Sequence, residues 1–306
     1  MSSKLKRALS AVPRLLNLDR RIDEIKINQG LILSQLQRDA RREHLWEYEF
    51  KVFSQWGEDG IIQHLVNHLK ITNRTFIEFG VEDFFESNCR YLMMKDRWSG
   101  YVIDGSPDNM QRLQSSYFYW QYPLSCKASF ITRDNVAALL DESGFDKDLG
   151  LLSVDIDGVD YHVLEALGAW RPAILVVEYN DVFGFERPVT VPYDAQFVRA
   201  RKHSSNQYWG ANLPAFCHLA RARGYALVGI NSVGSNAFFV RRELLNERVP
   251  EVNLATCSRP ATFRDSRDAQ GALTFLSGTA RADVIADMPL LDVATGATLT
   301  VGDLRG

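Results

Sequence analysis

The sequence contains little cysteine: four residues among 306, spread far apart at Cys89, Cys126, Cys217 and Cys257. No two of them form a C-x-x-C pair, which argues against a zinc site built on thiolates and against a disulfide framework. We therefore expect reduced thiols and a cytoplasmic protein.

Long hydrophobic runs and an excess of one charge are also absent. No apolar run approaches the roughly 20 residues that a membrane-spanning helix requires, so we expect no transmembrane segment. The basic N-terminus has only a short apolar stretch, interrupted by Pro13, which is not typical of a secretory signal. The 35 basic and 38 acidic residues give a formal net charge of −3. This balance gives no electrostatic reason to expect a nucleic-acid partner.

Hydrophobic patterning divides the chain into three regions, 1–50, 51–245 and 246–306. The first contains a heptad pattern of about three repeats, in which apolar residues recur at spacings of three and four and Gln29 fills the one polar position: Leu15, Leu18, Ile22, Ile25, Ile32 and Leu36. This pattern fits a short coiled coil that joins copies of the chain into a homo-oligomer. It fits equally a single amphipathic helix packed on its own domain. The last region has a weak pattern, and we expect a small β-rich or partly ordered appendage.

The central region alternates between short apolar runs and helical patterns. The runs, dense in Ile, Leu and Val, are 75–80, 100–104, 127–131, 149–154 and 173–178. Helical patterns cover 54–69, 88–96, 134–142 and 161–167. This alternation predicts βαβ crossovers and a parallel sheet. Two further strands, 225–230 and 237–240, flank a turn-rich link and predict an antiparallel edge strand. The expected fold is a doubly wound, Rossmann-like α/β sheet with an N-terminal helix.

Acidic residues follow four of the five predicted parallel strands. In an open parallel sheet, ligands bind at the carboxyl ends of the strands, near the point where strand order reverses. Several acids at this one edge therefore predict a binding site. The polar residues and the glycine at these ends are Glu78, Gly80, Asp104, Asp155, Asp157, Glu178 and Asn180.

The first two strand ends suit a nucleoside. Asp104 follows Glu78 by one βαβ step, where a carboxylate can accept both hydroxyls of a ribose. Gly80 allows the backbone to approach a ligand closely. The loop GVEDFFES has one glycine and three acids, so it would repel a pyrophosphate and suit the cationic cofactor S-adenosylmethionine. The alternative is structural: Glu78 and Glu82 would cap the following helix, and Asp104 would cap its own.

The later strand ends suggest a metal ion. Asp157, Glu178 and Asn180 offer the hard oxygen ligands that Mg²⁺ takes, and a metal there could lower the pKa of a sugar hydroxyl. The alternative is a loop that caps the next helix and contacts the cofactor without a metal.

The main candidates for the general base that would deprotonate an acceptor hydroxyl are Asp155 and His203. Asp157 and His162 are further candidates. His203 lies in a polar loop, RKHSSNQYWGAN, that could cover the site. Tyr208 and Trp209 of the same loop could stack on a sugar or aromatic acceptor.

An ordered set of motifs resembles the FkbM-type methyltransferases. The segments are FSQWGEDGII (53–62), FIEFGVEDFFESN (76–88), GYVIDGSPDN (100–109), SVDIDGVDYHVLEAL (153–167), VVEYN (176–180) and YALVGINSVGSNAFFVRREL (225–244), about two-thirds of the chain. The resemblance implies a class I methyltransferase fold, S-adenosylmethionine as donor, and an oxygen acceptor on a sugar, polyketide or polysaccharide. By position, it implies that Glu78, Gly80 and Asp104 hold the cofactor, and that Asp157, Glu178 and Asn180 correspond to the metal-binding acids of the family. We predict that the cofactor site also includes Gln55, Asn88, Gly105, Ser106 and Asp155.

Two departures from the family pattern stand out. Val81 and Glu82 replace further small residues in the first loop, and Glu178-Tyr179-Asn180 replaces a pair of aspartates. The sequence predicts an O-methyltransferase acting on a sugar hydroxyl of a glycan or glycosylated metabolite. Two other interpretations stay open: an NAD-dependent or nucleotide-sugar Rossmann enzyme, and a non-catalytic scaffold in carbohydrate synthesis.

Overall fold

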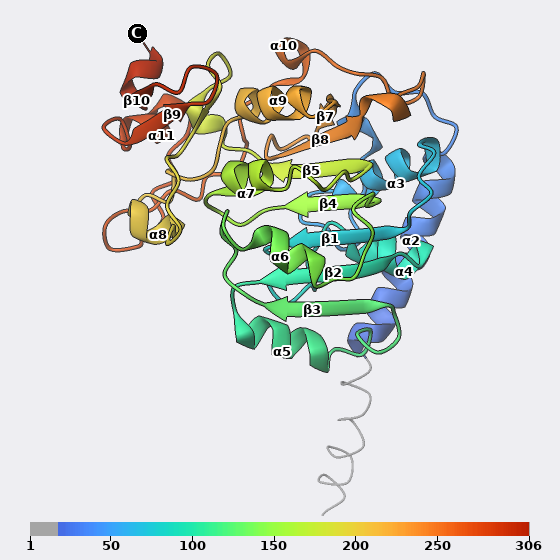
Figure 1. Ribbon diagram of the computed structural model, residues 1–306. Helices are drawn as coiled ribbons and strands as arrows, with labels where there is room; N and C mark the ends of the chain where they lie inside the picture. Colours follow the sequence, from blue (N-terminus) through green and yellow to red (C-terminus); the bar gives the residue numbers. More distant parts are fainter. Residues whose placement is uncertain (1–17, 306) are drawn as a thin grey trace, which may run out of the picture.

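A computed structural model of the protein describes residues 18–305 (Figure 1). Leu15, the first residue of the heptad pattern, lies outside the described residues. Among residues 18–305, no helix has both the length and the apolar character needed to cross a membrane.

A seven-stranded sheet forms the centre of the molecule, in the order β3-β2-β1-β4-β5-β8-β7. The first five strands are parallel, and β8 pairs antiparallel with both β5 and β7. Strand order reverses between β1 and β4, which makes their carboxyl ends the expected ligand-binding edge. The strands are β1 (Thr75–Phe79), β2 (Ser99–Asp104), β3 (Leu124–Ala128), β4 (Leu151–Val154), β5 (Ile174–Glu178), β7 (Tyr225–Ile230) and β8 (Asn236–Arg241).

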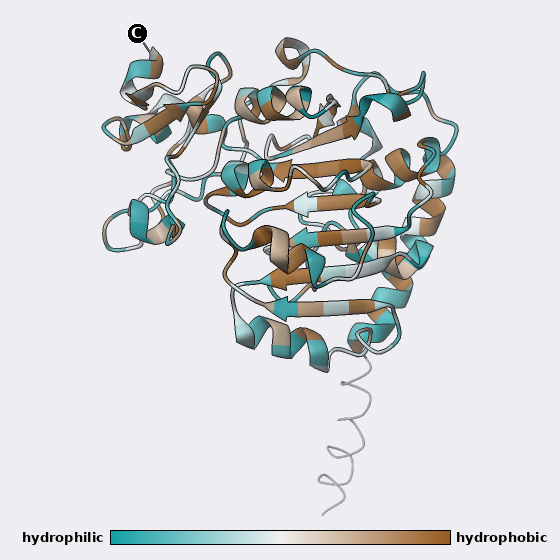
Figure 2. Ribbon diagram, in the orientation of Figure 1, coloured by the Kyte–Doolittle hydropathy of each residue, from teal (hydrophilic) through white to brown (hydrophobic). Residues whose placement is uncertain are grey.

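Helices cover both faces of this sheet. One hydrophobic core joins it to α3 (Glu58–His68), α4 (Arg90–Asp96) and α5 (Pro107–Ser115). A second core joins it to α6 (Val136–Asp141), α7 (Asp160–Ala166) and α9 (Leu213–Ala222). Neighbouring strand residues alternate between the two cores, as Phe76 and Ile77 do in β1. The strands are accordingly mostly hydrophobic in Figure 2. The predicted doubly wound α/β fold with an antiparallel edge strand is confirmed.

The N-terminal helix is α2 (Leu18–Gln37), and it packs on α3 and α4. Two predicted boundaries were wrong. The helix expected from residue 54 begins at Glu58, because 52–57 form a loop held by side chains of α3. The third strand is Leu124–Ala128 instead of 127–131, because Leu124 is the residue that aligns with Gly100 of β2.

A smaller antiparallel sheet, β10-β9-β6, joins the last region to the middle of the chain. It consists of β6 (Val189–Thr190), β9 (Pro289–Asp292) and β10 (Thr298–Thr300). In Figure 1 it lies with α8 (Arg199–Lys202) and α11 (Thr279–Asp283) beyond the arrowheads of the central strands. The remaining elements are α10 (Leu254–Cys257) and four 3-10 turns: η1 (Leu45–Tyr48), η2 (Asp181–Phe183), η3 (Arg242–Leu244) and η4 (Gly302–Arg305).

Candidate functional site

A cavity of about 650 Å³ opens at the carboxyl ends of β1, β2, β4 and β5. Among the described residues that line it, eight carry carboxylates, and Arg199 is the one that carries a positive charge. A cavity lined by one sign of charge concentrates ligands of the opposite sign. The acids are Glu78, Glu82, Glu86, Asp104, Asp155, Asp157, Glu178 and Asp265.

Gly80 closes the wall between β1 and β4. Its φ is +68°, and a Cβ at this position would lie 1.6 Å from the carbonyl oxygen of Asp155. Its N–H donates to the carbonyl of Ile103 at 3.0 Å. Only glycine therefore fits this turn, where three strand ends meet.

Glu78 lines the cavity and also organises its wall. Its carboxylate, on a side chain that is 4% exposed, accepts hydrogen bonds from Ser87 Oγ at 2.6 Å and from the N–H groups of Asn88 and Cys89. These bonds fix the loop 81–88 and the start of α4. Burial raises the pKa of Glu78. The carboxylate is thus engaged within the protein. Asn88 faces the cavity, and its side-chain amide donates to Ser153 Oγ.

Asp104 connects the loop after β1 to α5. It accepts the N–H of Glu82 at 2.9 Å, the N–H of Ser106 at 2.8 Å and Asn109 Nδ2 at 3.0 Å. A carboxylate has about four acceptor positions, so about one remains for a ligand, not the two expected for both ribose hydroxyls. Gly105 lines the cavity, whereas Ser106 caps α5 and is not part of the lining.

The loop 52–57 presents Gln55 and Trp56 to the cavity. One oxygen of Asp59 accepts the backbone N–H groups of residues 52–54 at 2.7–2.8 Å, and Glu58 accepts those of residues 56 and 57 at 3.0 Å. Burial raises the pKa of Asp59 to about 6. Sequence reasoning placed this segment inside a helix. The acidic pair Glu58 and Asp59 of the GED motif is suited to the start of a helix, so it could have predicted that the helix begins there.

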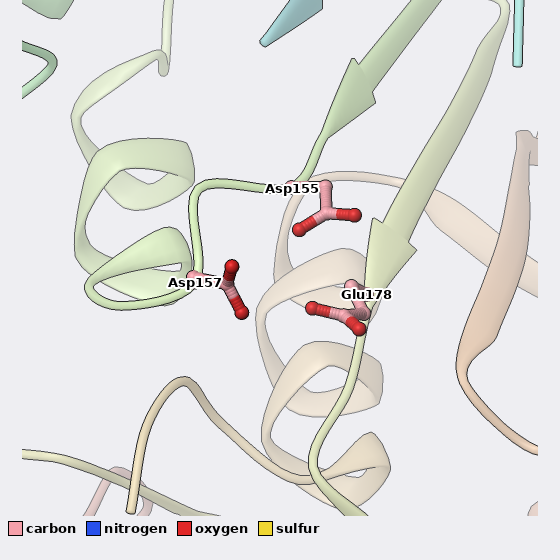
Figure 3. A group of neighbouring side chains, drawn as sticks. All are labelled: Asp155, Asp157 and Glu178. Carbon is pink, nitrogen blue, oxygen red and sulfur yellow. The ribbon is translucent and has the colours of Figure 1, made fainter. Parts of the chain in front are cut away.

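Asp155, Asp157 and Glu178 form an acidic group, with its carboxylates directed toward one another (Figure 3). Asp155 follows β4, Asp157 lies in the next loop, and Glu178 ends β5. Each contributes an oxygen within 4.8 Å of the others. Burial first, and then the neighbouring acidic charges, raise the pKa values of Asp155 and Glu178 well above their ordinary range. Asp160, the first residue of α7, by contrast accepts the N–H groups of Ile156 and Gly158 and so fixes the loop before the helix.

Arg199 supplies a positive charge beside this group. Its guanidinium contacts Asp157 at 2.5 Å and Asp265 at 2.7 Å, and lies over the ring of Trp209. Arg199 and Asp265 come from segments that sequence reasoning left without a role, and no local motif identifies either residue.

Besides Ser106, two further predicted site residues, Asn180 and His203, lie outside the cavity lining. Asn180 is fully buried: its amide donates to the carbonyls of Gln207 and Trp209, and its Oδ1 accepts the N–H of Val182. Because its side-chain oxygen is bonded to the backbone, Asn180 is not placed as a metal ligand. Asp155 is the third residue beside Asp157 and Glu178 in the acidic group. His203 contacts Ser205 Oγ through Nδ1 at 2.8 Å.

The aromatic residues at the cavity also differ from those expected. Tyr208 and Trp209 are 3% and 2% exposed, so they are core residues and offer no ring to a ligand. Trp56 and Phe263 line the cavity instead, with parallel rings whose centroids are 6.4 Å apart. His162 is buried against the carbonyl of Val191, and burial lowers its pKa.

No protein-family model matches this chain, and no curated protein matches it. Similar solved structures include an O-methyltransferase family protein from Burkholderia thailandensis, 11% identical over 72% of this chain with a TM-score of 0.34. This chain spans 58% of the length of that protein. A putative O-methyltransferase from Klebsiella pneumoniae is 10% identical, with a TM-score of 0.38 over 73% of this chain and 87% of its own.

The N-terminal domain of EvdMO1, solved with S-adenosylhomocysteine bound, is 9% identical, with a TM-score of 0.34 over 73% of this chain and 95% of its own. Similarities at these TM-scores carry no argument about function. The fold assignment rests on strand order, and any function must be argued from the cavity.

Proposed function

We propose that the protein is an S-adenosylmethionine-dependent O-methyltransferase of the FkbM type that its motifs resemble. The observation that supports it best is the charge of the cavity at the switch point, eight acids against one arginine. S-adenosylmethionine brings a sulfonium and an ammonium group to such a site. The pyrophosphate of NAD or of a nucleotide sugar would instead meet acids on most sides, at a repulsive cost that grows in a partly desolvated cavity.

The residues at the first two strand ends fit this cofactor. Asp104 retains an acceptor position for a ribose hydroxyl, and the turn at Gly80 lets the backbone come close to a ligand. Gln55 and Asn88 offer side-chain amides for the amino-acid end. Glu78 acts through the loop that it holds. S-adenosylmethionine, when bound, supplies the methyl group as an electrophile.

The acidic group is suited to the proton that the reaction releases. As the methyl group leaves the sulfonium and bonds to the acceptor oxygen, the hydroxyl proton must pass to a base. We assign that role to Asp155. A carboxylate with a raised pKa accepts a proton more readily near neutral pH. Arg199 holds Asp157 beside it. His203 has no role in this proposal.

Three carboxylates also fit a divalent cation by donor type and spacing, with Asp155 in the place predicted for Asn180. One oxygen of Glu178 is buried without a hydrogen-bond partner among the described residues. Magnesium there would stabilise an ionised acceptor hydroxyl. Arg199 already provides one positive charge to Asp157, so our proposal includes magnesium as an addition to be tested, not as a requirement.

A sugar hydroxyl is the acceptor that we propose. The cavity lining combines the rings of Trp56 and Phe263 with the charged groups of Asp157, Arg199 and Asp265. Flat apolar faces beside several hydrogen-bonding groups suit a polyhydroxylated ring.

Calorimetric titration of S-adenosylhomocysteine, first with EDTA and then with magnesium, tests the proposal. We expect micromolar binding. Asp104→Ala should weaken it by about 1.5–3 kcal/mol, because it removes a charge-assisted hydrogen bond. The exposed Asp108→Ala, in the first turn of α5, is the matched control. Binding of NADH instead would favour a dehydrogenase, and a folded protein that binds neither ligand would favour the scaffold.

A further inference from the structure

Helix α2 exposes most of its large apolar side chains. We call five of them, all at heptad positions, the α2 seam: Leu18, Ile22, Ile25, Ile32 and Leu36. Their side chains are between 43% and 73% exposed. A contiguous apolar stripe of this kind on a protein surface marks an interaction site.

The opposite side of α2 already has its contacts. Asp23 and Arg90 form an ion pair with side chains 8% and 2% exposed, and Tyr117 donates to the same carboxylate at 2.6 Å. Gly30 leaves no room for a Cβ against Tyr91 and Val52. At 100° per residue, the seam lies roughly 130° around the helix from this face. The helix therefore packs on its own domain, but through residues other than those of the heptad pattern.

We propose that the α2 seam binds the same seam of a second copy of this chain, as an antiparallel helix pair. A 3.5-residue apolar period is the pattern of helices that pack on one another. This inference is independent of the proposed catalytic function.

The charges beside the seam favour the antiparallel orientation. If Ile22 opposes Ile25 of the second copy, the described parts of the two helices overlap over residues 18–29, and Ile32 and Leu36 extend beyond this overlap. The flanking Asp19 then comes near Lys26 of that copy, and the reverse pair forms by symmetry. In a parallel pair, Arg21 would flank Lys26 of the other copy and repel it. Flanking charges of this kind set partner choice and orientation in coiled coils.

Anchoring of α2 removes the main energetic objection to so short a pair. Three heptads are marginal as a free coil, because the helix must be ordered at the same time as it associates. Here Asp23, Arg90 and the close contact at Gly30 already fix the helix on the domain. Association then costs little further ordering, which is the advantage of a preorganised surface.

Composition favours a second copy over a membrane surface. The helix contains three acidic residues (Asp19, Asp23 and Glu24) and three basic ones (Arg20, Arg21 and Lys26), so its formal charge is zero. It contains no aromatic residue. Helices that lie on anionic membranes are rich in lysine and arginine, with aromatic residues on the apolar face.

Sedimentation velocity over a dilution series tests the proposal with three full-length proteins: wild type, Ile22→Glu/Ile25→Glu, and Leu31→Glu. Leu31 is the matched control, because it is 43% exposed on α2 but lies off the seam. We expect dimers for wild type and Leu31→Glu, and monomers for the double variant with unchanged circular dichroism. For orientation, oxidised mixtures of Ile22→Cys and Ile25→Cys chains should cross-link more than either variant alone.

Several results would overturn the proposal. These are a monomeric wild type, a dimer that the double variant preserves, or a dimer that Leu31→Glu disrupts equally. Equal cross-linking of each cysteine variant alone would overturn the antiparallel orientation. Wild-type binding to phosphatidylglycerol vesicles that the double variant loses, without any dimer, would place a membrane surface on the seam.

Discussion

The two halves of the cavity are built in different ways. In the half that we propose binds the cofactor, the cofactor half, Glu78 accepts the N–H of Asn88 and Asp104 accepts the N–H of Glu82, which are 10 and 22 positions away along the chain. In the half that we propose binds the acceptor, the acceptor half, Arg199 links Asp157 to Asp265, residues separated by more than a hundred positions. The hydrogen bonds of the first half thus join residues of one βαβ step, and the ion pairs of the second join distant segments. The two halves should therefore respond differently to substitution.

The largest effect should come from Gly80→Ala in the cofactor half. A Cβ would overlap the carbonyl oxygen of Asp155, so the backbone of β1 or β4 must move. We expect loss of detectable S-adenosylhomocysteine binding by calorimetry, with a lowered Tm. Gly168→Ala is the control, since a Cβ there meets nothing within 4 Å. Wild-type affinity in Gly80→Ala would remove this turn from the cofactor wall.

Arg199→Met should affect the acceptor half without affecting the cofactor half. The change leaves Asp157 and Asp265 without their guanidinium, which disturbs the acceptor side but not the β1 and β2 turns. We expect kcat/KM for the acceptor to fall at least about tenfold, or 1.4 kcal/mol, with the cofactor Kd within about twofold of wild type. The exposed Arg201→Met on the same short helix should match wild type. A cofactor Kd that rises with the loss of activity would mean that the halves are one unit.

The free energy of unfolding should depend on pH through the raised pKa of Glu178 in the acidic group. Because the folded pKa of Glu178 is raised, the folded protein holds more protons than the unfolded chain. Stability should thus fall as pH rises from about 4.3, the ordinary value of glutamate, through the folded pKa. Glu178→Gln should remove part of this fall and raise the Tm at pH 8 by about 2–4 °C, the equivalent of about 1 kcal/mol.

The gain from Glu178→Gln should be smaller at pH 5, because protonation of the wild-type carboxyl increases as the pH falls. Thermal unfolding at both pH values checks this, with the exposed Glu186→Gln as control. An equal gain at both pH values would show that charge repulsion is not its cause.

The smallest effect should come from Phe263→Ala at the edge of the acceptor half. Loss of a ring parallel to Trp56 removes about 0.5–1.5 kcal/mol of stacking. We expect the acceptor KM to rise between about twofold and tenfold with kcat nearly unchanged. A matching rise in the cofactor Kd would assign this pair of rings to the other half.

Sequence patterns predicted the parts of the molecule that depend on neighbours in the chain. The strands are short apolar runs, and the acids and Gly80 follow them directly, so the fold and these residues of the cavity lining could be inferred. Arg199, Phe263 and Asp265 could not, because their position depends on how distant loops fold back. Asn180 was wrongly predicted to be a metal ligand for a related reason. It follows a strand, as a ligand would, but its amide donates to the backbone carbonyls of residues 207 and 209.

The pair of Arg281 and Asp181 links the last sixty residues to the rest of the protein. The guanidinium binds both carboxylate oxygens of Asp181 at 2.9 Å, and it also donates to Gln207. The two side chains are 5% and 7% exposed. A protein shortened to residues 1–245 would leave the carboxylate of Asp181 without this guanidinium and would leave β6 without its partner strand β9. Residues 246–306 are therefore a poor place to trim this chain for expression or for fusion to another protein.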